Sequence, residues 1–233
     1  MNKTVPQLMK EIENLDLSTH DGADGSRRRI VHPRKSKLLA KLRKENKTMT
    51  YVEEYVNGDY KLLIAHDEFA ESPREYCNQF RFVASGKYSV YNDESITPEE
   101  LVKCNKHNDY LTFPVYCYEH GGVAFNLTGF HCPWDSGQIG FMYASKLGIY
   151  NDYDVKRISP KLKEKLRKNA EAELQELEDY VMGNTFLYEL YKDEEELDSC
   201  SGFLGYDHEK NGLFEHVLEC SDVQFKAEHM VWG

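Results

Sequence analysis

The stretch SPKLKEKLRKNAEAELQELEDYVMGNTFLYELY, residues 159–191, decides the fold class. Ser159 can cap a helix, Pro160 suits its first position, and leucine or alanine recurs every three or four residues after them. Gly183 is typical of the residue just beyond a helix C-terminus. Residues 185–191 then favour a strand. The stretch predicts a long amphipathic helix over about 159–182, followed directly by a strand.

Hairpin patterns lie on both sides of this helix. Residues 111–118 alternate apolar and polar side chains, Gly121 and Gly122 suit a turn, and residues 123–127 return as the partner strand. Pro114 predicts a sheet edge or a bulge in the first of these strands. We therefore predict an α+β fold, an antiparallel sheet of hairpins with one long helix. Further elements are expected as strands at 60–66, 79–83, 140–144 and 201–206, an acidic turn at 193–196, and a short helix capped by Thr97.

The N-terminal residues differ from the rest in pattern. Residues 4–15 carry apolar side chains at the spacing of one helical face, and residues 18–26 contain two glycines without periodicity. Leu38, Leu39 and Leu42 would form a narrow apolar stripe on a second short helix. We predict a helical appendage over 1–48 with a flexible linker at about 18–26, and a main α+β domain over 49–233. The apolar faces of the appendage would allow a homodimer.

Charge is distributed unevenly along the chain. The formal net charge is −11, but residues 26–47 hold ten basic side chains against one acidic one, a local charge of +9 that leaves −20 for the remainder. Such an arm could contact nucleic acid or neutralise acidic protein surface, or be a solvated linker. The acidic body suits a basic protein surface better than nucleic acid, although net charge also serves solubility. The binding residues expected in the arm are Arg27, Arg28, Arg29, Arg34, Lys35, Lys37, Lys41, Arg43 and Lys44.

The sequence carries no pattern for membrane insertion or export. It has no continuous apolar run of the length that spans a bilayer, and its first residues lack the apolar core of a signal peptide. The six cysteines are scattered, without a CxxC pair. We expect reduced thiols in a cytoplasm and no membrane partner.

The loop at residues 130–138, FHCPWDSGQ, concentrates reactive side chains before a strand, and three interpretations stay open. Cys132 could be a nucleophile with His120 or His131 as its base and Asp135 orienting the ring. His120, His131, Cys132 and Asp135 could instead bind a metal, with His66 or Asp67, although paired zinc-ligand spacing is absent. A structural role would place Pro133 and Trp134 under the sheet, let Asp135 and Ser136 bond their own backbone, and give Gly137 an unusual φ.

Other chemical signals are weaker. The segment at 198–202, DSCSG, is explained by turn chemistry and a buried thiol at Cys200. The sequence contains no P-loop, GxGxxG, GxSxG or HExxH motif. We therefore expect no cofactor and no resident metal, and a binding role is favoured over an enzymatic one.

Four segments resemble, in order, a group of bacteriophage and mobile-element accessory proteins that have no established activity: DEFAESPRE (67–75), LTFPVYCYEHGG (111–122), CPWDSGQIGFMYAS (132–145) and DSCSGFLG (198–205). The resemblance spans about residues 59–206, and residues 1–50 have no counterpart in it. It implies a small accessory protein acting in the cytoplasm of an infected bacterium.

This context favours a protein that works by binding. We expect an inhibitor of a host defence or nucleic-acid-processing system, an anti-CRISPR or antirestriction protein, whose acidic surface engages a host protein or ribonucleoprotein complex while the basic arm contacts nucleic acid or the partner. The alternative is a cysteine- or metal-dependent hydrolase using loop 130–138.

Overall fold

A computed structural model describes residues 50–233, together with the backbone of residues 19–21 and 27–29. The described chain from residue 50 forms two compact units: unit 1 comprises residues 50–70 and Gly183–Gly233, and unit 2 comprises Glu71–Met182. The sequence led us to expect a single main domain over 49–233. The difference arises because the first hairpin of the body pairs with strands more than a hundred residues later, which local patterns do not show.

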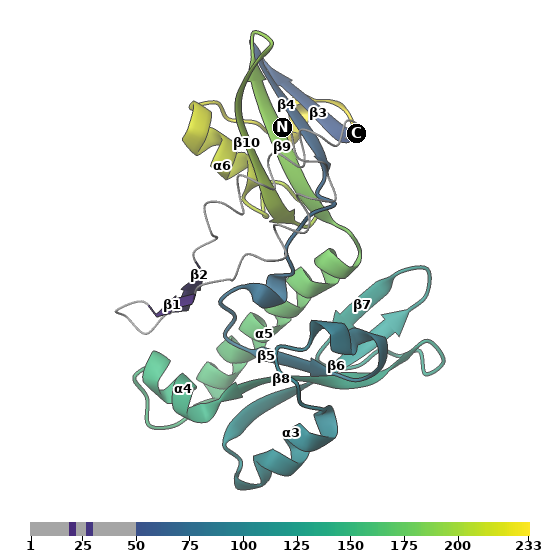
Figure 1. Cartoon of the computed structure of the whole chain (residues 1–233), viewed down its shortest axis with the longest axis vertical. Coiled ribbons are helices and arrows are strands. Elements are labelled where there is room, and N and C mark those ends of the chain that lie inside the picture. The colour runs from purple at the N-terminus through teal and green to yellow at the C-terminus, as the bar shows by residue number, and fades with distance from the viewer. Residues whose placement is uncertain (1–18, 22–26, 30–49) are drawn as a thin grey trace, which may run out of the picture. The chain divides into compact units, whose positions relative to one another are not determined.

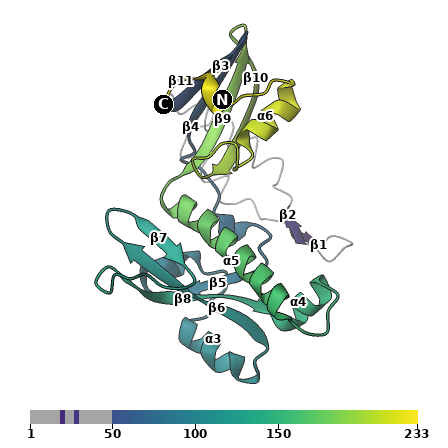
Figure 2. The same cartoon turned by 180° about the vertical axis from the view of Figure 1, so that it is seen from behind.

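Unit 2 is a four-stranded antiparallel sheet with a helix on each face (Figures 1 and 2). The strand order is β5-β8-β6-β7. The long helix α5 (Pro160–Val181) covers one face and the short helix α3 (Pro98–Cys104) the other. The remaining elements of unit 2 are η1 (Pro73–Glu75), β5 (Arg81–Ala84), η2 (Gly86–Tyr91), η3 (Asn105–His107), β6 (Tyr110–Glu119), β7 (Val123–Asn126), β8 (Ser136–Ser145) and α4 (Lys146–Asp152).

The main core of unit 2 forms where the predicted apolar stripe of α5 meets the sheet. Leu166, Ala170, Leu174 and Leu177 of α5 are buried against strand residues that include Phe82 and Met142. The Ser159 hydroxyl accepts a hydrogen bond from Leu162 N at 3.2 Å, which confirms the predicted cap. On the opposite face, Leu101 of α3 packs with Val83 and Tyr143, because neighbouring strand residues point to opposite sides.

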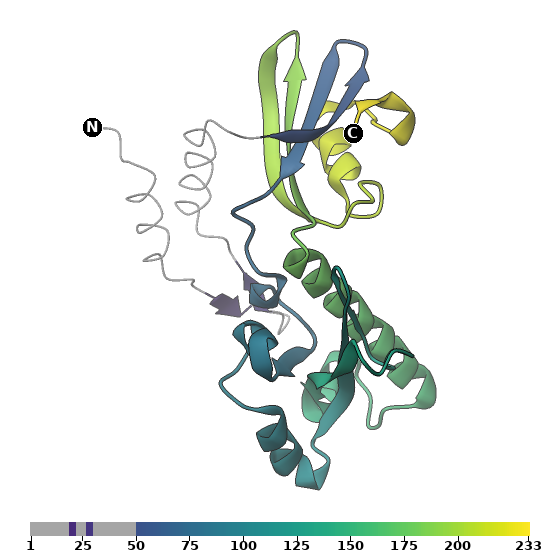
Figure 3. The ribbon, with the colours of Figure 1, turned by 90° about the vertical axis from the view of Figure 1, so that its right-hand side faces the viewer.

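Unit 1 is a five-stranded antiparallel sheet of order β10-β9-β4-β3-β11, with helix α6 (Leu213–Ser221) on one face (Figure 3). Its core contains Leu62, Ile64 and Tyr188 from the strands with Leu213 and Val217 from α6. The strands are β3 (Tyr51–Asn57), β4 (Tyr60–His66), β9 (Thr185–Lys192), β10 (Glu195–Leu204) and β11 (Met230–Trp232), with η4 (Ala227–His229) before the last of them.

Several sequence predictions are confirmed and others are not. The α+β class, the hairpin over 111–127 and the Thr97 capping box are as expected. Pro114 lies just before a register shift between Val115 and Tyr116, as a bulge requires. Strand β10 begins at Glu195, inside the predicted turn, because Asp193 and Glu194 alone supply the two positive-φ residues that the hairpin needs.

The predicted appendage falls mostly outside the described residues, including both of its expected helices. Within it, β1 (Thr19–Asp21) pairs antiparallel with β2 (Arg27–Arg29), so residues 19–21 of the expected linker form a strand. Within the described part of the chain, no helix has the length and apolar character required to cross a bilayer.

Candidate functional site

The predicted reactive loop lies at one end of the sheet of unit 2. Residues 130–135 connect to β8, whose first residue Ser136 pairs with Tyr118 of β6. The backbone N–H of Glu119 donates to the carbonyl of Asp135 at 2.9 Å. Because β6 and β8 pair at this end, His120 is brought beside the loop from a separate hairpin.

Asp135 is the centre of the side-chain contacts in this loop. Its Oδ2 lies 3.5 Å from Nδ1 of His120 and accepts a hydrogen bond from the Cys132 thiol, also at 3.5 Å. The carboxylate therefore lies between the thiol and the imidazole. Nucleophilic catalysis needs the thiol to bond the base directly, with the carboxylate beyond the ring. Cys132, Asp135 and His120 are brought together as predicted, but Asp135 lies between the other two. This arrangement suits hydrogen bonds that hold the loop in place.

The metal interpretation of the loop gains no support from its neighbours. His131 is exposed, and the predicted loop residues form no group of three possible ligands within the part of the chain that the structure describes. The other suggested ligands lie in unit 1 and have their own contacts. His66 Nδ1 is 3.1 Å from the carbonyl of Gly183, and Asp67 accepts the N–H of Phe69.

The structural interpretation of the loop is wrong for three residues, Pro133, Trp134 and Gly137. Pro133 and Trp134 are both exposed instead of lying under the sheet, Trp134 at 92%. The loop side chain that packs against Tyr118 is Phe130, with ring centroids 5.6 Å apart. Gly137 is an ordinary strand residue of β8 and is not among the positive-φ glycines. Ser136 does bond the backbone as expected, donating to the carbonyl of Cys132.

The basic arm is described only in part. Arg27, Arg28 and Arg29 form strand β2 opposite Thr19–Asp21, and their side chains are not among the described groups. The other predicted binding residues of the arm, Arg34, Lys35, Lys37, Lys41, Arg43 and Lys44, lie outside the described residues.

The acidic surplus of the body is concentrated in unit 1. Residues 50–70 and 183–233 carry 17 acidic and 4 basic side chains, a net charge of −13 over 72 residues. Unit 2 carries 17 acidic and 13 basic side chains, a net charge of −4 over 112 residues. The sequence alone hid this contrast, because the two segments of unit 1 are separated by the whole of unit 2.

Two acidic turns of unit 1 lie side by side at the same end of its sheet. The N–H of Asp193 donates to the carbonyl of Asp59 at 3.3 Å, which joins the β9–β10 turn to the β3–β4 turn. At these turns Lys61 and Glu194 form an ion pair at 3.8 Å, with the Glu194 side chain 90% exposed. Exposed pairs of this kind contribute about 0–1 kcal/mol to stability. Residues 59–61 and 192–196 together hold five acidic and two basic side chains, so these turns keep a net negative charge. We call the following exposed residues the acidic tip: Asp59, Asp193, Glu194, Glu195 and Glu196.

A second acidic group is held rigidly on the sheet itself. Both Tyr51 and Tyr191 donate their hydroxyls to Oε2 of Glu189, at 2.6 and 2.7 Å. Burial, followed by the bond to Glu189, raises the pKa of Tyr191 to about 12. Both phenols therefore stay neutral donors at physiological pH, and Glu189 keeps a fixed orientation.

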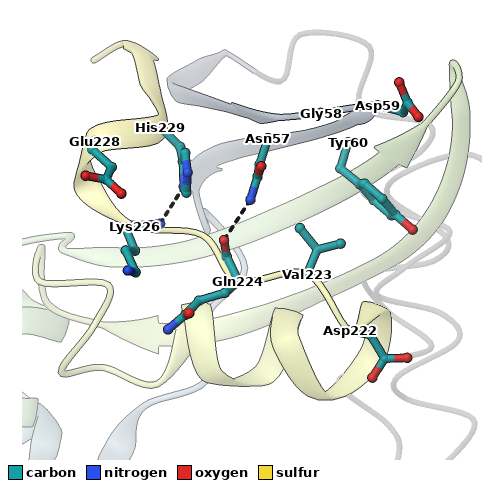
Figure 4. A pocket seen from close by; sticks show the side chains of 10 residues that line it. All are labelled: Asn57, Gly58, Asp59, Tyr60, Asp222, Val223, Gln224, Lys226, Glu228 and His229. Atoms are coloured by element: carbon teal, nitrogen blue, oxygen red, sulfur yellow. Dashed lines mark hydrogen bonds between the residues drawn. The ribbon is translucent and has the colours of Figure 1, made fainter.

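An open pocket of about 520 Å³ lies between the β3–β4 turn and the segment after α6. Figure 4 shows Asp59, Tyr60 and Asp222 at one end and Lys226, Glu228 and His229 at the other. Two hydrogen bonds fix its walls: Asn57 Nδ2 donates to the carbonyl of Gln224 at 2.9 Å, and Lys226 N donates to His229 Nδ1 at 3.1 Å. The pocket is therefore a polar hollow beside the acidic tip.

The end strand β11 adds apolar surface to unit 1. Met230, Val231 and Trp232 are all exposed, Trp232 at 43%. The indole N–H of Trp232 donates to Oε2 of Glu54 at 2.7 Å, which fixes the ring at the sheet edge. Exposed tryptophan and methionine beside charged groups are typical of protein interfaces.

Comparisons of the chain with protein-family models, with curated proteins and with solved structures find no match. The resemblance to phage accessory proteins stays a prediction.

Proposed function

We propose that this protein acts by binding, and that unit 1 engages a basic, nucleic-acid-binding surface of another protein and blocks it. The observation that carries the proposal is the segregation of charge, 17 acidic against 4 basic side chains in residues 50–70 and 183–233. Solubility requires net charge but gives no reason to concentrate it in one unit while the other is nearly balanced. Complementary charge accelerates encounter and selects the partner.

The contacts of unit 1 support a protein partner. The acidic tip presents carboxylates from two turns whose backbones are joined by a hydrogen bond, so the two turns are held side by side. Glu189 and Glu54 are oriented by phenol and indole donors. The exposed apolar strand β11 belongs to the same sheet and can bury area that charge alone cannot. Nucleic acid is a poor partner for this unit, because phosphates need compensating cations.

The resemblance to phage accessory proteins and the basic arm at residues 26–47 indicate which class of protein the partner belongs to. The family context favours a bacterial defence or nucleic-acid-processing complex as the target. We infer that the basic residues between 26 and 47 contact nucleic acid or an acidic part of the same complex, and that catalysis is not needed. The bridging position of Asp135 between Cys132 and His120 gives no specific support to the hydrolase alternative.

Two matched variants of the full chain test the proposal. The tip variant neutralises four carboxylates of unit 1, and the control variant neutralises four exposed carboxylates of unit 2, so both change the net charge equally. The tip variant is Asp193→Asn, Glu194→Gln, Glu195→Gln, Glu196→Gln, and the control is Glu99→Gln, Asp109→Asn, Asp152→Asn, Asp154→Asn. Asparagine suits the positive φ of Asp193 and Asp154, so neither change strains the backbone.

The assay is capture from bacterial lysate at low and high salt, followed by the nucleic-acid-binding or nuclease activity of the captured protein. We expect the wild type and the control to retain and inhibit one basic protein, and the tip variant to lose both effects. Equal retention by all three forms, or capture of nucleic acid without protein, would contradict the proposal. Circular dichroism of each variant verifies that it is folded.

A further inference from the structure

Three side chains of metal-binding type meet on the face of unit 1 that α6 covers. They are Asp198 of β10 with His216 and Cys220 of α6, and the carboxylate oxygen, ring nitrogen and sulfur all lie within 4.8 Å of one another. Figures 1 and 2 show α6 beside β10. None of the three belongs to loop 130–138 or to the acidic tip.

Secondary structure explains why these residues converge. His216 and Cys220 are four positions apart on α6 and therefore project from one face of the helix. Leu213 and Val217 of the same helix are buried in the core, which fixes the helix against the sheet. Asp198 follows the bulge of β10 after Glu196, so its side chain is partly buried toward the helix while Ser199 is exposed. The predicted turn at 198–202 is thus part of a strand that offers a ligand.

The cluster also has the support that metal ligands usually have. The buried Tyr188 donates its hydroxyl to Oδ2 of Asp198, which orients the carboxylate. The His216 ring packs 6.0 Å from the rings of both Tyr188 and Phe203. Groups that hold a ligand in place in this way are a regular part of protein metal sites.

We propose that Asp198, His216 and Cys220 bind one zinc ion. Carboxylate, imidazole and thiolate together match the ligand preferences of Zn²⁺, whereas Ca²⁺ and Mg²⁺ prefer oxygen alone. Ligand atoms at about 2.0–2.3 Å from a tetrahedral zinc lie about 3.3–3.8 Å apart. Because the three atoms are at most 4.8 Å apart, each separation needs to shorten by no more than about 1.5 Å. The exposed Cys220 can make that movement by a rotamer change.

Binding exchanges a proton for the metal. The Cys220 S–H bond breaks, its proton goes to the buffer, and a sulfur–zinc bond forms with no change in oxidation state. Three protein ligands leave a fourth position, which solvent reaches past the exposed Cys220. The ion would join α6 to β10 and stabilise unit 1.

Cobalt provides a direct spectroscopic probe of the site. The full chain, stripped with a chelator and kept reduced, is titrated with Co²⁺ alone and then with Zn²⁺ alone. We expect a sulfur-to-cobalt charge-transfer band and the intense visible bands of tetrahedral cobalt, saturating at one ion per chain and abolished by Zn²⁺. Absence of the charge-transfer band from the folded wild-type chain would overturn the proposal.

Variants locate the ligands. Cys220→Ala should lose the charge-transfer band, and His216→Ala should weaken Co²⁺ affinity at least tenfold. Tyr188→Phe should keep the band but weaken affinity by about 10–100-fold, as expected for a residue that only orients a ligand. The matched control is Cys104→Ala, since Cys104 is likewise exposed near the end of a helix, and it should bind as the wild type does.

Each contrary result is decisive. A band that persists in Cys220→Ala would show that another thiol binds the metal. A band lost in the Cys132→Ala, His120→Ala double variant would place the metal at loop 130–138 and overturn the assignment to α6. Circular dichroism accompanies each titration, and because Cys220 is exposed, its substitution should leave the fold intact.

Discussion

Arg74 provides the sharpest test of what holds unit 2 together. Its guanidinium donates to the carbonyl of Phe80 at 2.6 Å and to Oδ2 of Asp93 at 2.7 Å, and lies 3.6 Å from Oε2 of Glu173 on α5. The side chains of Arg74, Asp93 and Glu173 are only 4%, 11% and 14% exposed. The Arg74→Met variant fills similar space but leaves two buried carboxylates without their cation.

The expected loss of stability in Arg74→Met follows from the burial of these three side chains. Removing one partner of a buried ion pair costs about 3–5 kcal/mol. With a urea dependence of about 2 kcal/mol per molar for a unit of this size, the unfolding midpoint should fall by about 2 M. The control is Arg81→Met, whose ion pair with Glu94 at 3.0 Å is about half exposed, and that change should cost less than about 1 kcal/mol. Urea unfolding followed by circular dichroism measures both variants.

At acid pH, Arg74→Met should lose less free energy of unfolding relative to wild type than it does at neutral pH; we call this loss the deficit. Burial raises the pKa of Glu173 above its ordinary value, while Arg74 acts to lower it. A carboxyl whose pKa is raised by folding favours the folded state at low pH, and this contribution is lost as the pH rises through the folded pKa. Without Arg74 the pKa of Glu173 rises further, so the deficit should be largest at neutral pH and shrink toward pH 4. A deficit below about 1 kcal/mol, or one independent of pH, would refute this reasoning.

Three further predictions concern unit 2. In Gly140→Ala the new Cβ would lie 1.9 Å from the carbonyl oxygen of Val83. We therefore expect the free energy of unfolding to fall by about 3 kcal/mol or more. A urea midpoint equal to that of the wild type would contradict the close packing of β5 on β8. Ser159→Ala removes the cap of α5 and should cost about 1 kcal/mol, measured by thermal unfolding, whereas an unchanged Tm would mean the cap contributes nothing. The Cys132→Ala, His120→Ala double variant should leave partner capture and inhibition unchanged, and loss of inhibition with binding retained would point to catalysis in the loop.

The sequence predicted correctly those features that depend on interactions between residues close together in the chain, such as helix α5 and the helix caps. The three-to-four spacing of Leu166, Ala170 and Leu174 placed α5 correctly, and its buried face is the one expected. Thr97 and Ser159 cap their helices because each hydroxyl accepts an N–H three residues on. These features depend on residues within one or two turns of each other, so the sequence is sufficient.

The division into two units could not be predicted in that way. Leu62 of β4 pairs with Leu190 of β9, and the intervening segment folds as unit 2. Neither end of that segment is marked by a linker composition, because Ala70 and Gly183 lie within ordinary turns and caps. The acidic unit depends on this distant pairing, so it was not visible in the sequence. Asp198, His216 and Cys220 lie in one segment of the chain, but they meet only because α6 lies beside β10, which spacing does not show.

For loop 130–138, the sequence predicted which residues come close together but not how their side chains contact one another. Strand pairing between β6 and β8 brought His120 to Asp135, as the hairpin pattern allowed. The order of the contacts, with Asp135 between thiol and imidazole, depends on side-chain directions that spacing does not specify. Trp134 is exposed, and the loop side chain that packs on Tyr118 is Phe130.

We propose above all that unit 1, through its acidic tip, occupies a nucleic-acid-binding surface of its partner. The most direct measurement is a competition in which the captured partner is held at fixed concentration and its affinity for duplex nucleic acid is measured with and without this protein, at several salt concentrations. We predict mutually exclusive binding that weakens with salt and requires the acidic tip. Simultaneous binding of nucleic acid and this protein to the partner, or competition unaffected by the tip variant, would contradict the account.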